Sequence, residues 1–251
     1  MFRAILSLVG LLALIPVSAR AESPSITLRA PAESLAFARY IASIRERDPF
    51  TESEPVLVEI EASLPGLYKQ SSLLAIRQTG ESERTEYQVL QIEGDATVTQ
   101  EVIARYLGLQ KEVEDLPRSS VEITPLNYRF RYMGMVGVGD TTAYIFRITP
   151  KKNRAGLLRG QLWIDLATGT AVLEAGRLVT TSSPFVRRIE VVRDTRLLDG
   201  SPSVRITHAV IETQRLGRGE LTITEYRLAA EEKGPSRPTG ASGRPLAAVA
   251  H

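Results

Sequence analysis

The chain has 251 residues, of which 43% are hydrophobic and 24% are charged, and these values are ordinary for a soluble globular protein with a buried core. Lys and Arg number 31 against 29 Asp and Glu, so no strong overall field is available to capture nucleic acid or an anionic membrane. Cysteine is absent from the sequence, which excludes disulfides, thiolate metal sites and a lipid-modified cysteine.

The first 21 residues have the pattern of a secretory signal peptide. Arg3 supplies a basic start, an apolar run extends from Ala4 to Val17, and Ala19 and Ala21 provide small residues at a cleavage site. The run is short for a membrane span, and an uncleaved N-terminal anchor is the alternative. The sequence therefore predicts a periplasmic protein cleaved after Ala21. Loss of Arg3 and Arg20 takes two from the 31 basic residues and leaves 29, equal to the acidic ones.

Two helices are predicted in the first half of the chain. Residues 31–48 carry apolar side chains at helical spacing, and we expect these to form a buried stripe: Leu35, Ala38, Ile41, Ala42 and Ile44. A second helix is predicted to begin at residues 97–101, capped by Thr97 or Thr99, with an apolar stripe before Gly108 made of Val102, Ile103, Tyr106 and Leu107. Residues 110–117 continue it in an acidic and less regular pattern.

Most of the remaining chain alternates between apolar and polar residues, which is typical of strands with one buried face. Turn residues such as Asp199-Gly200 separate consecutive strands and predict antiparallel hairpins. The predicted fold class is mainly β with α (α+β), in which helices cover a curved antiparallel sheet. Residues 22–230 form this domain and residues 231–251 a disordered tail. Strands are expected near residues 56–60, 71–77, 86–92, 126–133, 141–149, 160–165, 170–179, 185–193, 203–213 and 220–228.

The stretch RGQLWIDLATGT, residues 159–170, holds the chain's one tryptophan. Strand geometry places Leu162 and Ile164 on one face and Trp163 with Asp165 on the other. Asp165 is expected to accept hydrogen bonds in the turn, and Gly169 to adopt a positive φ. We interpret Trp163 as an outer, partly exposed side chain with a bonded indole N–H, and a ligand-facing Trp163 is the alternative.

Three segments of the sequence resemble a known protein family. The YxFxY strand at residues 128–132, the strand ending in Thr149-Pro150-Lys151 and the G-x-L-W-I-D-x-x-T-G segment are similar to the outer-membrane lipoprotein carrier superfamily of LolA- and LolB-like proteins. The resemblance implies an incomplete β-barrel whose concave apolar face is covered by helices and receives acyl chains. The similarity covers residues 30–228, and its specific part is residues 126–176.

The sequence carries little catalytic chemistry. One of its two histidines, His208, alternates with Val204, Ile206 and Val210 and is interpreted as a sheet histidine; the other ends the chain. Neither a G-x-S-x-G elbow nor a calcium-loop spacing occurs. We therefore predict no catalytic residues, no metal site and no cofactor. Because alternation separates Arg129 and Arg131 from the aromatic face, no nucleic-acid partner is predicted either.

The leading hypothesis is a non-enzymatic carrier that holds the acyl chains of a lipid or lipoprotein in an apolar cavity. The competing hypothesis is an envelope interaction or sensor module that binds a membrane or envelope protein along a sheet edge. Alternation marks a buried face without showing whether protein fills it, so a closed core is the alternative for every proposed ligand-binding residue. These residues are Tyr128, Phe130, Tyr132, Tyr144, Phe146, Ile148, Leu162 and Ile164 in the sheet, and Leu35, Phe37, Ile41 and Tyr106 in the lid.

Overall fold

The computed structural model describes residues 32–45, 55–79, 85–138, 141–180 and 185–228. The predicted signal peptide at residues 1–21 and the predicted tail at residues 231–251 lie outside the described residues, so both stay predictions. The described residues belong to one compact unit that begins at Pro31.

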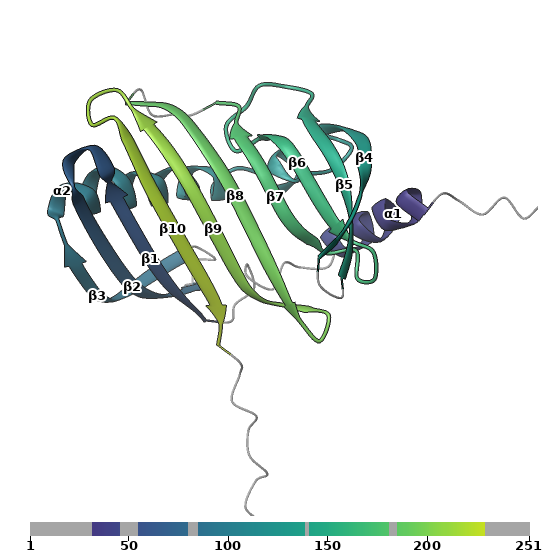
Figure 1. Cartoon of the computed structure of the whole chain (residues 1–251), viewed down its shortest axis with the longest axis horizontal. Helices are drawn as coiled ribbons and strands as arrows, with labels where there is room; N and C mark the ends of the chain where they lie inside the picture. The colour runs from purple at the N-terminus through teal and green to yellow at the C-terminus, as the bar shows by residue number, and fades with distance from the viewer. Residues whose placement is uncertain (1–31, 46–54, 80–84, 139–140, 181–184, 229–251) are drawn as a thin grey trace, which may run out of the picture. The chain divides into compact units, whose positions relative to one another are not determined.

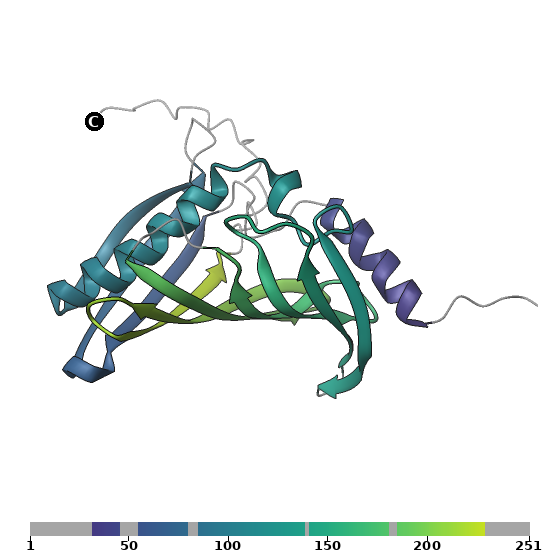
Figure 2. The same ribbon diagram turned by 90° about the horizontal axis from the view of Figure 1, so that it is seen from above.

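Ten strands form one antiparallel sheet with the order β3-β2-β1-β10-β9-β8-β7-β6-β5-β4 (Figure 1). Every neighbouring pair is antiparallel, and β1 pairs with the last strand, β10. Figure 2 shows that the sheet is strongly bent. The strands are β1 (Val56–Leu64), β2 (Lys69–Thr79), β3 (Thr85–Gly94), β4 (Tyr128–Val138), β5 (Thr141–Pro150), β6 (Leu158–Asp165), β7 (Ala171–Leu178), β8 (Val186–Leu198), β9 (Ser201–Thr213) and β10 (Arg218–Arg227).

The helices before β1 and between β3 and β4 cover one face of the sheet, which we call the inner face. A nearly continuous helical segment is made of α2 (Ala96–Val98), the π-helix η2 (Thr99–Ala104) and α3 (Arg105–Glu114). The other helices are α1 (Ala32–Arg45), the 3₁₀ turn η1 (Pro65–Leu67) and α4 (Arg118–Val121). Among the described residues, no helix is long and apolar enough to cross a membrane.

The predicted fold class is confirmed. The sheet is entirely antiparallel, it is curved, and it ends in two edge strands, β3 and β4, that do not pair with each other, so the barrel is incomplete. Each predicted strand segment corresponds to an observed strand. At the Asp199-Gly200 turn both residues have positive φ, 51° and 78°, which is the geometry of a tight two-residue hairpin.

Helix and strand ends differ from the predictions in several places. The cap of the second helix is Asp95, whose carboxylate accepts the backbone N–H of Thr97 at 2.8 Å, and neither threonine serves as the cap. The helix runs through the exposed Gly108, and Leu109 and Val113 prolong its apolar face; it ends at Glu114, within the predicted continuation at residues 110–117. Strand β8 continues to Leu198 because β9 pairs with it over its whole length.

The inner face carries two separate hydrophobic clusters. One lies under α2, η2 and α3 and is built on the alternating residues of β1, with Val102, Ile103 and Tyr106 packed over them. The other lies under α1 and contains Ala36, Tyr40 and the inner residues of β4, β5 and β6. Burial of each large aliphatic side chain contributes roughly 1.5 to 3 kcal/mol, so both clusters are substantial sources of stability.

Candidate ligand-binding trough

Hydrogen bonds join helix α1 to the β6–β7 hairpin, which contains the RGQLWIDLATGT stretch. Arg39 Nη1 donates to the carbonyl of Leu166 at 2.6 Å, and Ser43 Oγ donates to the carbonyl of Gly169 at 3.3 Å. The phenol of Tyr40 donates to the carbonyl of Ile123 at 3.0 Å, and burial raises the pKa of Tyr40 well above its ordinary value. The hairpin is therefore the anchor of the N-terminal helix.

The hairpin itself has the predicted geometry. Asp165 accepts from the backbone N–H and the hydroxyl of Thr168, each at 2.7 Å, and Gly169 has a φ of 77°. Trp163 is half-buried on the outer face, and its indole N–H donates to Gln161 Oε1 at 3.1 Å. Leu162 and Ile164 are fully buried on the inner face. The outer placement of Trp163 is confirmed.

The predicted apolar stripe of α1 is wrong in its details. The residues that α1 buries most completely are Ala36 and Tyr40, whereas Leu35 is 47% exposed and Ala38 and Ala42 are exposed. The helix is apolar on several sides, so residue spacing alone does not show which side packs against the sheet. The β6–β7 hairpin determines that side, because Gly169 leaves room for the backbone of α1 at Arg39 and Tyr40.

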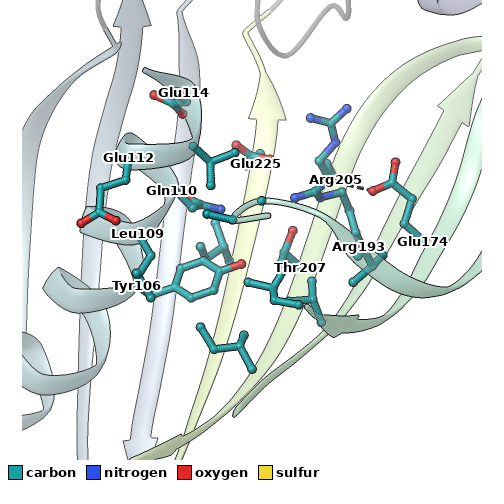
Figure 3. A pocket seen from close by; sticks show the side chains of 18 of the residues that line it. Tyr106, Leu109, Gln110, Glu112, Glu114, Glu174, Arg193, Arg205, Thr207 and Glu225 are labelled. Atoms are coloured by element: carbon teal, nitrogen blue, oxygen red, sulfur yellow. Dashed lines mark hydrogen bonds and ion pairs between the residues drawn. The ribbon is translucent and has the colours of Figure 1, made fainter. Parts of the chain in front are cut away.

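Below α3 lies a cavity of about 290 Å³, which we call the α3 cavity. Its walls are apolar at Tyr106 and Leu109 on the helix and at Ile189, Val191 and Ile223 on the sheet. Figure 3 shows Tyr106 and Leu109 on the helix side and Arg193, Arg205 and Glu174 on the opposite side of the cavity. Burial raises the pKa of Tyr106 above its usual range.

A second hollow of about 650 Å³, the α4 groove, adjoins the first. It lies between α1, α4 and the ends of β7, β8 and β9, and it shares Leu158, Glu174 and Arg193 with the α3 cavity. The two hollows together form a trough along the inner face of the sheet. Tyr40 and Ile44 from α1 line the end of this trough that lies next to α1.

Charged residues cross the floor of the trough. Arg77 Nη1 lies 2.6 Å from Glu225 Oε1, with only 15% and 10% of the side chains exposed, and Arg193 Nη1 lies 2.8 Å from Glu174 Oε2. Strand register puts Arg205 opposite Glu225 and Arg193 opposite Glu174. We call these five residues, Arg77, Glu225, Arg205, Arg193 and Glu174, the charged row. Charges taken out of water cost free energy unless they are paired, so packing of the sheet alone does not account for the charged row.

The predicted ligand-binding residues divide into several groups. Tyr106 lines the α3 cavity, and Tyr128 lines the α4 groove, where its hydroxyl accepts the backbone N–H of Leu158 at 2.9 Å. Five others are buried in the cluster under α1, namely Tyr144, Phe146, Ile148, Leu162 and Ile164. The remaining five lie at the margin of that cluster or beyond it: Phe37, Ile41 and Phe130 are half-buried, and Tyr132 and Leu35 are exposed.

Sequence reasoning missed the charged row. Arg193 follows Ile189 and Val191 at a spacing of two, and Arg205 is in phase with Ala209 and Ile211. A charged residue in phase with an inward apolar series is the signal that could have identified it, because an inward charge needs a partner or a ligand.

His208 lies on the outer face, with Nδ1 3.0 Å from Thr222 Oγ1. It lines a depression of the outer face together with Glu61 and Ser72, which lie two and three strands away across β10 and β1. Strand spacing puts these at about 10 and 14 Å, beyond hydrogen-bond reach, so the three do not form a catalytic triad. Within the described ranges, no cluster of three or more His, Asp or Glu side chains is placed to hold a metal ion.

No family model and no curated protein matches the sequence. Three solved structures are similar: a LolA superfamily protein from Nitrosomonas europaea (12% identity, 80% of this chain and 95% of that chain, TM-score 0.33), a DUF1329 family protein from Desulfovibrio piger (11%, 80% and 95%, 0.37), and an outer membrane lipoprotein-sorting protein domain from Vibrio parahaemolyticus (8%, 80% and 96%, 0.30). These names include the superfamily that the sequence motif resembles.

Proposed function

We propose that the protein is an exported, non-enzymatic carrier that binds an acyl-chain amphiphile, a lipid or a lipoprotein, in the trough below α3. The observation that supports this most is the α3 cavity, a hollow between helix and sheet that has both apolar and charged walls and about the size that small ligands occupy. Burial of an acyl chain is favourable by about 0.8 kcal/mol per CH₂, so several covered methylenes suffice for useful affinity.

The charged row favours an amphiphile over a pure hydrocarbon. An acyl chain would lie against Tyr106, Leu109 and Ile223, and a polar group at its end would reach Arg193 and Arg205. Arg193 already pairs with Glu174 at 2.8 Å. A polar group of the ligand therefore meets donors and acceptors that are held in place beforehand, which reduces the ordering cost of binding.

The proposal assigns the cavity under α3, and not the aromatic cluster under α1, as the main acyl-chain site. The aromatic cluster is occupied by Ala36 and Tyr40 of α1, while the cavity retains open volume. Of the residues proposed from the sequence, Tyr106 and Tyr128 keep a direct role in lining the trough. Ligand binding by the other ten stays a prediction, and for the five that are buried under α1 it requires this helix to move.

The experiment is binding of a fluorescent fatty acid to the purified protein, with mass spectrometry of any lipid that co-purifies. Leu109→Trp adds bulk to the helix wall of the cavity and is expected to weaken binding by about tenfold, the effect of losing one or two buried methylenes. Leu198→Trp is the control, because Leu198, the last residue of β8, is 66% exposed and lines neither hollow. Absence of both bound lipid and fatty-acid binding in the unmodified protein would refute the proposal.

A further inference from the structure

The two edge strands of the sheet have complementary properties. Strand β3, TEYQVLQIEG, contains two glutamates and no basic residue, whereas β4, YRFRYMGMVGV, contains two arginines and no acidic residue. Both strands expose large apolar side chains at between 40% and 65%: Val89, Leu90 and Ile92 on β3, and Tyr132, Met133 and Met135 on β4. Neither strand carries the Lys or Pro that commonly protects a sheet edge.

The distribution of these residues between the two faces is the same on both strands. Register places Val89 and Ile92 on the inner face of β3, and Tyr132 and Met135 on the inner face of β4. The charged residues Glu86, Glu93, Arg129 and Arg131 are all on the outer face. Each strand also has one bulged residue, Leu90 or Met133, near its middle.

The topology lets the two edges meet between copies of the chain. The sheet has ten strands and every neighbouring pair is antiparallel, so its two edge strands run in opposite directions. Figures 1 and 2 show β3 and β4 at opposite sides of the sheet. A second copy in the same orientation therefore brings its β3 antiparallel to β4 of the first, with the inner faces continuous.

We propose that β3 of one copy adds to β4 of the next, so that the protein self-associates head to tail through a continuous antiparallel sheet. The register that puts Glu93 opposite Arg131 also puts Ile92 opposite Tyr132 and Val89 opposite Met135. All three pairs then match in face, and the two bulges fall beside one another. Main-chain hydrogen bonds supply the contact, and the charged pairs select the partner edge.

This interface is heterologous, because two different edges meet. It can therefore extend beyond a dimer or close into a ring. Self-association is expected to rise with protein concentration and to weaken with salt, because Glu93 and Arg131 are not buried. The inference does not depend on the proposed ligand.

The test is sedimentation velocity of the purified protein over a range of concentrations, with two charge-reversal variants. Glu93→Arg and Arg131→Glu each place like charges across the interface, and each is expected to weaken association by about tenfold or more. An equimolar mixture of the two variants restores opposite charges at the junctions between unlike copies, so it is expected to regain association that neither variant shows alone. Mere loss of folding would not be rescued by mixing.

Glu61→Arg is the matched control, because Glu61 is exposed on the outer face of β1, an interior strand that lies two strands from the β3 edge and pairs with β2 and β10. It is expected to leave association unchanged, and circular dichroism checks that all the variants are folded. A protein that stays monomeric at every concentration in low salt overturns the proposal. Association that is insensitive to both edge reversals also overturns it, since another surface would then be responsible.

Discussion

Gly169 lies directly against Arg39, so close that a Cβ on the glycine would be 2.7 Å from the carbonyl carbon of Arg39 and 2.9 Å from the backbone nitrogen of Tyr40. Real Cβ atoms essentially never approach backbone atoms so closely. The glycine of the β6–β7 turn is thus required twice, once for its φ of 77° and once for the approach of α1. The contact joins the hairpin motif to the helix that covers the aromatic cluster.

Substitution of Gly169 is expected to weaken the packing of α1 on the hairpin. A second glycine, Gly217, separates the effect of the positive φ from the effect of the close helix contact. Gly217 has nearly the same φ, 75°, but nothing lies within 4 Å of the point that a Cβ would occupy there. Gly217→Ala is expected to cost about 1 to 2 kcal/mol of unfolding free energy through its backbone conformation alone. Gly169→Ala is expected to cost at least about 1 kcal/mol more, because the added methyl overpacks the helix contact.

Urea denaturation measures both variants, and hydrogen exchange of residues 32–45 reports on α1 directly. Faster exchange in this helix is expected for Gly169→Ala alone. Equal costs for the two variants, with unchanged exchange in α1, would mean that the helix adapts to the methyl group.

The Arg77–Glu225 pair gives a prediction about the charged row. Glu225→Ala leaves the guanidinium of Arg77 in a site where only 15% of its side chain is exposed, and we expect a loss of about 2 to 4 kcal/mol. Joint replacement by Arg77→Met and Glu225→Leu is expected to recover most of this loss, because two apolar side chains need no ionic partner. A double variant as unstable as the single one would contradict this account.

The exposed Arg218–Glu220 pair is the control for that experiment. Its side chains are 62% and 45% exposed, so Glu220→Ala is expected to change the unfolding free energy by less than about 0.5 kcal/mol. Thermal or urea denaturation in the same buffer measures all of these variants together.

Alkaline pH should destabilise the protein through buried tyrosines. Burial raises the pKa of Tyr87 and of Tyr128 from 10.0 to about 12. Between these values the folded protein holds phenolic protons that the unfolded chain has released. Their stabilising contribution is therefore complete below about pH 10 and is lost as the pH rises toward about 12.

Urea midpoints measured at about pH 9 and about pH 11 test this dependence. Tyr128→Phe is expected to lower stability at both values, because Leu158 N–H loses its acceptor, and to reduce the difference between them. Tyr68→Phe is the control, since Tyr68 is 99% exposed. A difference that Tyr128→Phe leaves intact would assign the alkaline loss to other groups.

The strands were predictable because their evidence is local. Alternation in β1, β5 and β6 and the turn residues at Asp199 and Gly200 report on backbone geometry within a few residues. The site was less predictable because its geometry is not local. Arg77, Glu174 and Glu225 come from β2, β7 and β10, and only the order of the strands brings them to one trough.

Helix α1 illustrates the same limit. Its spacing offered Leu35 and Ala38 as buried residues, yet the helix buries Ala36 and Tyr40 because Gly169 and Ile123 lie there to receive them. Similarly, alternation marked Phe146 and Leu162 as inward-facing, which is correct, but an inward residue can be covered by a helix as well as by a ligand.

The β6–β7 hairpin also yields a prediction, because its rarest residue is not its most important one. Trp163 is half-buried on the outer face with a single local hydrogen bond to Gln161, so Trp163→Phe is expected to cost less than about 1 kcal/mol. Asp165 is buried and accepts two hydrogen bonds from Thr168, which close the turn onto which α1 docks. Asp165→Ala is therefore expected to cost about 2 to 4 kcal/mol and to speed hydrogen exchange in α1. Urea denaturation ranks the two variants, and a larger cost for Trp163→Phe would show that the indole makes a contact essential to the fold.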